Sequence, residues 1–499
     1  MNKRNNNIQS DSIMKKTLFI LILTIISIPA FQTLKAQTTT MYGMKHIPQY
    51  GYDNPARQPA CKLYIGFPAL NSVGTNVQFA GLSLNNIITP NAQNDSFHVD
   101  LNNIADALEN SNLLGVENHL SIIEFGFSLE GNQYITFSVR NKTQQFFSFS
   151  DQLLDIRNGN YKADGSPLVF DLKERFINYN EYSLGYSYKM LNNLTIGGRL
   201  NVYSGNAFVN TNKLNIQWHT GTGEEEMYPW RWVSDVNIQA AAIPDWEITE
   251  DENGVMNGLE YDEEFYKTKP ARLAMSKNFG LGLDAGVNYR MYDWLNLSAS
   301  VKDFGFIKWK TNAKEITQKG EFEFSGIDIA DYFENIADLS DINLGDTILQ
   351  EFTDTLLQEF LPAQTDKSFT SFMSSKFFAG AEFHVNDWLD FGALYHGMLI
   401  NKHLYSSLSV SANANFWKGW ALSLNYAIAN RAYNNIGVGL AYKLGPLQMY
   451  FITDNIAPAL YMWDKEFTRD HLYNTKSVNL HFGINFLFCG PKHDYGLMF

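Results

Sequence analysis

Residues 279–302 read FGLGLDAGVNYRMYDWLNLSASVK and carry the pattern that decides the fold. Every second residue from Phe279 to Tyr289 is apolar, and the alternate residues from Gly280 to Arg290 are Gly, Asp, Asn or Arg. After a tight turn the same alternation resumes from Leu295 to Val301. A period of two is typical of a β-strand, and about ten residues per limb is the length that a tilted strand needs to cross a bilayer. The stretch therefore predicts a transmembrane β-hairpin with an apolar face toward lipid and a small, polar face toward a lumen.

The first 36 residues predict export. Met14-Lys15-Lys16 is a basic start, residues 17–28 form an apolar run, and Leu34-Lys35-Ala36 is a cleavage site before Gln37. This is the pattern of a secretory signal peptide, with its true start at Met1 or Met14, and it is too short for a spanning helix. Removing residues 1–36 takes away five of 38 basic and one of 52 acidic residues, which leaves a net charge of −18. Phosphate binding needs basic clusters, so the mature chain is not expected to bind nucleic acid.

The rest of the chain holds no apolar stretch near the ~20 residues of a membrane helix. An exported chain rich in amphipathic strands is then either a soluble sandwich or propeller, or an outer-membrane barrel. Strands of about ten to twelve residues favour the barrel, because strands in soluble sheets average five or six. Trp294, Trp388, Trp417 and Trp420 lie beside tight turns, as in an interfacial aromatic belt, although aromatic residues can also pack a soluble sheet edge there.

Tight turns alternate with long connections along the predicted strands. The turns lie at residues 130–132, 191–193, 291–293, 386–387, 417–419 and 445–446. Bacterial barrels show this asymmetry, with short periplasmic turns and long extracellular loops, and six such hairpins with one strand at each end give about 14 strands. Residues 212–241 add two candidate strands. They raise the count to about 16 if they cross the membrane and leave it at 14 if they extend the wall.

The chain is thus predicted to be all-β, an antiparallel transmembrane β-barrel spanning residues 61–488. Residues 37–60 show no period and form either an N-terminal plug or a periplasmic lead-in. Within one long loop, residues 346–361 show apolar spacings of three and four, which predict an amphipathic helix, either a solvated packing element or a lid. Residues 489–499 are a C-terminal tail.

Several phrases carry a family resemblance. In chain order they are MYGMKHIPQYGYDNPA, CKLYIGFP, LSASVKDFGFIKW, FGALYHG and NNIGVGLAYKLGPLQMYFITDNI. Together, from about Met41 to Phe488, they resemble an uncharacterised outer-membrane barrel family of the Bacteroidota, a domain of unknown function with no chemistry to carry over. A more remote similarity, carried by Asn54-Pro55-Ala56, is to barrels of the long-chain fatty-acid transporter type. That similarity implies fourteen strands, an N-terminal hatch and, by analogy, transport of hydrophobic molecules.

No motif for catalysis or metal binding is present. The ten histidines form no HExxH pattern, no CxxC or GxSxG occurs, and the sequence therefore predicts no enzyme, no metal and no cofactor. By the alternation rule, nine charged or histidine side chains face the lumen, since an Arg facing lipid at the midplane costs ~2–4 kcal/mol. They are Arg140, Arg199, Asp284, Arg290, Lys302, Glu382, His384, His396 and Lys443. Glu382, His384 and His396 are expected to be hydrated wall residues, with a histidine-based hydrolytic site as the alternative. The other six are expected to pair across the lumen, where they pin a plug or narrow a channel.

The two cysteines of the mature chain flank the predicted barrel. Cys61 opens the first candidate strand and Cys489 follows the last. The first and last strands of a closed barrel are neighbours, so these thiols either form a disulfide, which an oxidising periplasm permits, or remain free on different levels of the wall.

Two functions remain open from the sequence. The first is a non-enzymatic barrel of the cell outer membrane, surrounded by its lipids, that passes or binds small or hydrophobic molecules. The second is a structural or accessory component of an envelope export or gliding apparatus, with an envelope protein as its partner.

Overall fold

The computed structural model describes residues 39–90, 97–221, 229–242, 246–250, 256–261, 276–324, 362–400, 403–417, 419–429, 432–456 and 476–489. The expected signal peptide, the helix expected at 346–361 and all of the expected tail except Cys489 lie outside these residues. Within the described ranges, no helix has both the length and the apolar character needed to span a membrane.

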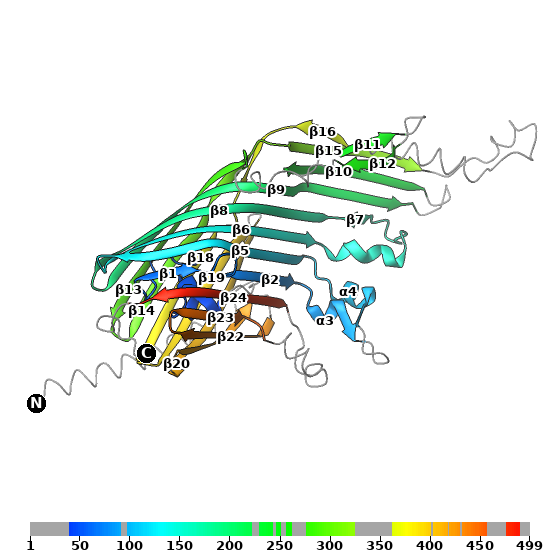
Figure 1. The fold of residues 1–499 in the computed structure, drawn as a ribbon. Coiled ribbons are helices and arrows are strands. Elements are labelled where there is room, and N and C mark those ends of the chain that lie inside the picture. The colour runs from blue at the N-terminus through cyan, green and yellow to red at the C-terminus, as the bar shows by residue number, and fades with distance from the viewer. Residues whose placement is uncertain are drawn as a thin grey trace, which may run out of the picture.

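The described strands form a closed antiparallel barrel of fourteen wall positions (Figure 1). One position is shared by β1 (Leu63–Gly66) and β2 (Val73–Ala80), which both pair with β24 (Ser477–Phe488) on one side and β5 (Asn112–Leu129) on the other. The ring continues through β6 (Gln133–Phe149), β8 (Leu172–Leu191), β9 (Leu194–Thr220), β13 (Phe279–Tyr292), β14 (Leu295–Trp309), β18 (Lys376–Asn386), β19 (Leu389–Ile400), β20 (His403–Trp417), β21 (Trp420–Ala429), β22 (Ala432–Leu444) and β23 (Leu447–Thr453). The predicted all-β, fourteen-stranded barrel is confirmed.

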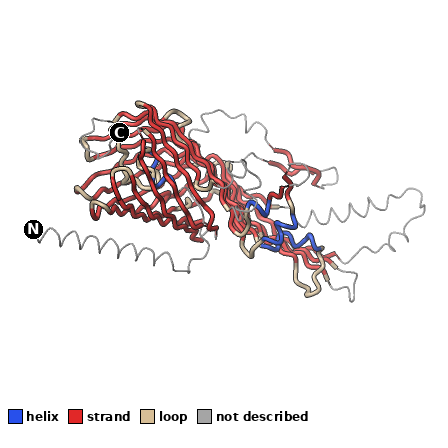
Figure 2. Tube along the Cα trace, turned by 90° about the horizontal axis from the view of Figure 1, so that it is seen from below, coloured by secondary structure: helices blue, strands red, loops and turns tan. Residues whose placement is uncertain are grey.

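One side of the wall continues beyond the barrel. The distal half of β9 pairs with β10 (Trp230–Ala241), which pairs with β15 (Ala313–Phe324), and β16 (Ala363–Asp366) pairs with β15. Two short strands border the same region, β7 (Leu168–Phe170) along β9 and β17 (Phe369–Phe372) along β14. The extension projects from the end opposite the tight turns (Figures 1 and 2). The candidate strands at 212–241 therefore extend the wall, and the count of sixteen does not apply.

Small elements lie outside the ring. They are the helices α3 (Leu84–Ile87) and α4 (Leu101–Ala107), the 3₁₀ segment η2 (Asp151–Asn158), and the strand pairs β3 (Ile88–Pro90) with β4 (Phe97–Val99) and β11 (Trp246–Glu250) with β12 (Met256–Tyr261).

The two faces of the wall differ as the alternation predicts. In β13, Phe279, Leu281 and Leu283 are each 47% exposed, whereas the next residue, Asp284, is 2% exposed. The apolar rows thus lie on the outside of the cylinder, where a sandwich would have buried them between sheets. Beside two of the tight turns, Trp388 and Trp420 are also exposed. Such a continuous exposed apolar belt is typical of a barrel in lipid.

A bulge in β14 places two consecutive charged residues inside. Asp303 has a φ of 57°, and the pairing of β13 with β14 shifts between Leu283 and Ala285. Lys302 and Asp303 are both buried as a result, although strict alternation would turn Asp303 outward. An extra residue in one strand commonly redirects a side chain in this way.

Candidate functional site in the barrel lumen

Residues 39–60, called the plug below, lie inside the barrel. They contain the short helix α2 (Thr40–Gly43) and the 3₁₀ segment η1 (Pro48–Gly51), whose helical turns lie within the ring of strands (Figure 2). Met41, Met44 and Ile47 are at most 3% exposed. They pack with the inward side chains of β21, β22 and β23 in one apolar cluster. Tyr42 packs in a second apolar cluster with Phe378 on β18 and Leu394 on β19. The plug is therefore seated on two parts of the wall by hydrophobic contact.

Charged contacts hold the rest of the plug. The guanidinium of Arg57 lies 2.5 Å from Glu382 on β18, and the Lys302 ammonium lies 2.8 Å from Asp53. From β9, Arg199 donates to the backbone carbonyls of Gly51 and Tyr52 at 3.0 Å each. Burial alone would raise the pKa of Asp53, but the neighbouring Lys302 holds this pKa below its usual value. The plug carboxylate is therefore ionised and paired with the wall.

The Asn54-Pro55-Ala56 turn fits against two wall glycines. The side-chain oxygen of Asn54 accepts a hydrogen bond from the Ala56 amide at 2.9 Å, and its Nδ2 donates to the carbonyl of Val287 at 3.1 Å. A Cβ added at Gly197 would lie 2.3 Å from the Pro55 carbonyl oxygen, and one at Gly286 would lie 2.1 Å from Asn54 Oδ1. These strand glycines leave the space that the turn occupies.

We expect Gly197→Ala to loosen the plug, because the new methyl group overlaps backbone atoms that cannot rotate away. Limited proteolysis of the purified protein should then cleave within residues 39–60 at least about tenfold faster, the effect of ~1.4 kcal/mol of lost seating energy. The neighbouring Gly198→Ala is the matched control, since its Cβ would meet only one backbone oxygen at 3.8 Å. Equal cleavage of both variants would contradict this seating.

A second charge network stiffens the wall beside the plug. Asp284 accepts hydrogen bonds from Arg199 and Asn201, at 3.0 Å each, and from the Asp303 amide at 2.8 Å. On β8, Glu181 lies 3.0 Å from Arg140 and 2.5 Å from Lys142. All these side chains except Lys142 are among the most buried polar groups of the described chain.

The structure separates the nine residues expected in the lumen into three groups. Arg140, Arg199, Asp284, Lys302 and Glu382 join the buried networks, and buried His396 lines the cavity described below. Arg290 and the half-exposed His384 line a vestibule at the turn end of the barrel. Lys443 lies at that end too, beside Cys489. The alternation did not identify the partners Asp53, Arg57, Lys142, Glu181 and Asp303. Of these, Lys142 and Glu181 follow the same period in strands that extend further than predicted.

Two open spaces flank the plug. On the side of the wall extension lies a cavity with about 100 Å³ of space for the centres of water-sized groups. Its described lining includes the charged residues Asp53, Glu117, Arg140, Lys142, Lys302, Asp303 and Lys376 and the histidines His119, His396 and His481. At the turn end, the vestibule offers about 490 Å³ and is lined by Lys45, Arg57, Glu382 and Asp390, among others. The plug lines both spaces and lies between them.

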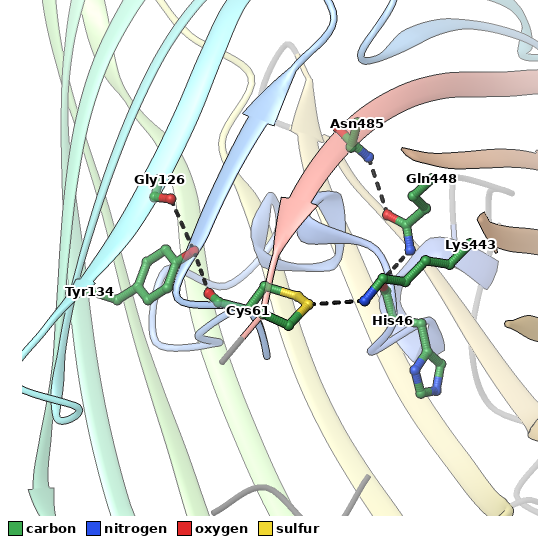
Figure 3. Close-up of a disulfide and its surroundings, with 8 residues drawn as sticks. His46, Cys61, Gly126, Tyr134, Lys443, Gln448 and Asn485 are labelled. Atoms are coloured by element: carbon green, nitrogen blue, oxygen red, sulfur yellow. Dashed lines mark hydrogen bonds between the residues drawn. A yellow bond between two sulfur atoms is a disulfide. The ribbon is translucent and has the colours of Figure 1, made fainter. Parts of the chain in front are cut away.

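A disulfide joins the first and last strands of the cylinder. Cys61 and Cys489 are bonded across 428 positions of sequence, and Lys443 donates to the Cys489 sulfur at 3.1 Å (Figure 3). The Cys61 carbonyl accepts a hydrogen bond from Tyr134 at 3.1 Å. The bond therefore lies where β24 meets β1, at the seam that closes the barrel.

Reduction should reveal this bond and its effect. We expect the mass of the mature protein to rise by about 2 Da on reduction, and Cys61→Ser to lower the free energy of unfolding by roughly 4–5 kcal/mol in the loop-entropy model. Intact-mass spectrometry and denaturant unfolding measure the two quantities. An unchanged mass, or equal stability of the oxidised protein and the Cys61→Ser/Cys489→Ser variant, would contradict a bonded pair.

The chain also matches several solved barrel structures at low sequence identity. The toluene transporter TbuX of Ralstonia pickettii is 9% identical, with 88% of this chain and 94% of that chain covered and a TM-score of 0.37. A FadL homologue of Pseudomonas aeruginosa is 10% identical, with 92% and 100% covered and a TM-score of 0.39. The translocator domain of the autotransporter NalP from Neisseria meningitidis is 10% identical, with 86% and 88% covered and a TM-score of 0.27. These scores are low, so the three proteins carry no inference about the activity of this chain.

At the sequence level, no curated protein matches the chain. A family model does match, over residues 55–454, which takes in the wall from β1 to the end of β23 and the Pro55-Ala56 part of the plug turn. Because that match covers most of the sequence, the chain belongs to the family of unknown function DUF5723.

Proposed function

We propose that this protein is a non-enzymatic barrel of the outer membrane that passes small molecules through a lumen controlled by its N-terminal plug. The observation that carries the proposal is the position of residues 39–60, which lie between a cavity and a vestibule inside a closed cylinder. The exposed apolar belt supports the membrane location, because only closed barrels and helices satisfy all backbone groups within lipid.

The contacts of the plug suit a movable element. With β9, β13, β14 and β18 the plug makes hydrogen bonds and ion pairs, such as Arg57 with Glu382 and Lys302 with Asp53. Water can replace such contacts when a plug moves within a hydrated lumen, whereas a large buried apolar interface would resist displacement. The apolar contacts of the plug lie on β21, β22 and β23 and, through Tyr42, on β18 and β19. The larger cluster, on β21, β22 and β23, is the side on which we expect the plug to pivot.

The lining of the lumen favours polar over hydrophobic molecules on the axial route. The cavity is surrounded by charged and hydrogen-bonding side chains from β2, β5, β6, β14, β18, β19 and β24. Moving a long apolar molecule through it would leave those groups without partners, which costs free energy for each group. Binding of a hydrophobic ligand, or of an envelope protein, stays a prediction from the sequence.

The membrane location can be tested with two leucines of equal exposure. Leu200 on β9 and Leu101 on α4 are each 64% exposed, but only Leu200 belongs to the wall. Leu200→Arg should destabilise the folded barrel in lipid by ~2–4 kcal/mol, whereas Leu101→Arg should change the free energy of unfolding by at most about 0.5 kcal/mol. Urea titrations of the folded protein in bilayers measure both values. Equal losses of unfolding free energy in the two variants would mean that the exposed apolar belt of the wall does not lie in the hydrocarbon of the bilayer.

Passage itself is tested by reconstitution. Liposomes that contain the mature protein without residues 39–60 should admit small solutes, because nothing then occupies the lumen. Failure of every small solute to enter, even without the plug, would reject the proposed function.

A further inference from the structure

Several buried polar groups of the cavity have unused hydrogen-bonding capacity. Within the described residues, both ring nitrogens of His396 and both of His481 have no hydrogen-bond partner, and the same holds for the side-chain oxygens of Asn76 and Gln144. All four side chains line the cavity, and their residues are between 2% and 6% exposed. Buried polar groups are nearly always satisfied in folded proteins, so this concentration at one cavity indicates a site for a hydrogen-bonding ligand.

The charges around the same cavity are already balanced. Lys376 lies 3.0 Å from Glu117, and Lys302 lies 2.8 Å from Asp53. Lys142 and Arg140 both contact Glu181, and Lys142 also lies 3.3 Å from Asp303. Each lysine and arginine of the described lining thus has a carboxylate partner. A ligand with a net charge would have to compete with these ion pairs, whereas a neutral one would not.

The space limits the size of the ligand. A buried water needs roughly 10–15 Å³ of such space, so a cavity of this volume accommodates on the order of eight water-sized groups. Phe378 and Tyr52 add aromatic surface to the lining. Long-chain lipids exceed this size, but a small ring compound with several hydroxyl groups matches it.

A glycine on β2 brings two of the histidines together. His119 on β5 and His481 on β24 both pair with Gly74, and their ring centroids are 5.1 Å apart. A Cβ at Gly74 would lie 2.2 Å from His481 Nδ1 and 2.3 Å from His119 Cε1. The two rings therefore occupy the space that a larger residue would fill, and His119 is fixed by a 2.9 Å contact with Ser72 Oγ.

From these observations we infer that the cavity binds a neutral polyhydroxylated solute of about monosaccharide size. The unpartnered nitrogens of His396 and His481 and the oxygens of Asn76 and Gln144 recognise its hydroxyl groups. An imidazole nitrogen with a proton donates to a hydroxyl oxygen and one without a proton accepts, while the amide oxygens accept. This inference rests on the proposed function, since it names the class of solute that would meet the cavity on its way through the lumen.

The test uses the full mature protein in nanodiscs, with D-glucose as the neutral probe and glutamate and lysine as charged comparators. Isothermal titration calorimetry should show glucose binding more tightly than either comparator. His396→Phe/His481→Phe should weaken glucose binding by about tenfold or more, because it removes several hydrogen bonds but keeps the ring volume. His384→Phe, in the vestibule, is the matched control and should leave affinity unchanged. If the double variant does not assemble, Asn76→Leu provides the same comparison.

The outcomes separate this inference from the proposed function. Tighter binding of glutamate or lysine, an unchanged affinity in the double variant, or no binding of glucose would overturn the inference. Glucose binding without entry of any solute into plug-deleted proteoliposomes would reject passage while leaving the neutral site in place. Solute entry without glucose binding would support passage and reject the neutral site.

Discussion

Deletion of residues 39–60 is expected to raise the ionic conductance of the barrel by at least about tenfold, because fourteen strands enclose a lumen that can hold a water-filled channel when nothing occupies it. The deletion also removes the plug partners of Arg199, Lys302 and Glu382, while Arg199 keeps its ion pair with Asp284. These wall charges would then face water in the emptied lumen, so the cylinder should still assemble. Single-channel recording in planar bilayers measures the change.

Deletion of α4 (Leu101–Ala107) is the control, since this helix lies outside the ring and should leave the conductance unaltered. The migration of unheated samples on a gel would show that both deleted proteins are folded barrels. If plug deletion left conductance at its original level in folded protein, the plug would not be the element that closes the lumen.

The second large effect is expected for Asp284→Ala. Its carboxylate is 2% exposed and accepts hydrogen bonds from Arg199, Asn201 and the Asp303 amide. Removing one partner of a buried ion pair leaves an uncompensated charge, which typically costs 3–5 kcal/mol. Denaturant unfolding of the protein in bilayers should show a loss of about that size, and the bulge at Asp303 should become more mobile because its amide loses its acceptor.

Asp235→Ala provides the comparison on the wall extension. Asp235 pairs with Lys213, and both side chains are at least one-third exposed, so its loss should cost at most about 1 kcal/mol. Similar losses for Asp284→Ala and Asp235→Ala would mean that the lumen around β13 is as hydrated as the outer surface, contrary to the burial described above.

The alternation in the sequence was enough to predict the wall and several of its inward charges. It located Arg140, Arg199, Asp284, Lys302 and Glu382 on the lumen side, because each follows the two-residue period within a strand. The period is a local property, so it needed no knowledge of distant contacts. For the same reason it stopped short of the full strands: β9 continues to Thr220 through residues 204–213, SGNAFVNTNK, where polar and apolar residues do not alternate.

The contacts of the plug could not be predicted from local patterns. Asp53 and Arg57 lie in a segment without period, and their partners Lys302 and Glu382 are 249 and 325 positions away. The bulge that turns Asp303 inward depends on a positive φ that a non-glycine residue rarely adopts. Likewise, the glycines at 197 and 286 read simply as small lumen residues, and only the fold shows that the Asn54-Pro55-Ala56 turn occupies the space above them.

A disulfide trap between the plug and the wall, made in the Cys61→Ser/Cys489→Ser background, tests most directly whether the plug lies inside a membrane barrel. A Cβ at Gly437 would lie 2.3 Å from Thr40 Oγ1, so Thr40→Cys/Gly437→Cys should crosslink spontaneously in isolated outer membranes. The pair Thr40→Cys/Gly131→Cys, with Gly131 at a tight turn and in open space, should not. Crosslinking of the first pair alone, with the protein in the membrane fraction, is the predicted result. Absence of that crosslink, or recovery of the protein as a soluble species, would contradict a plugged barrel in the membrane.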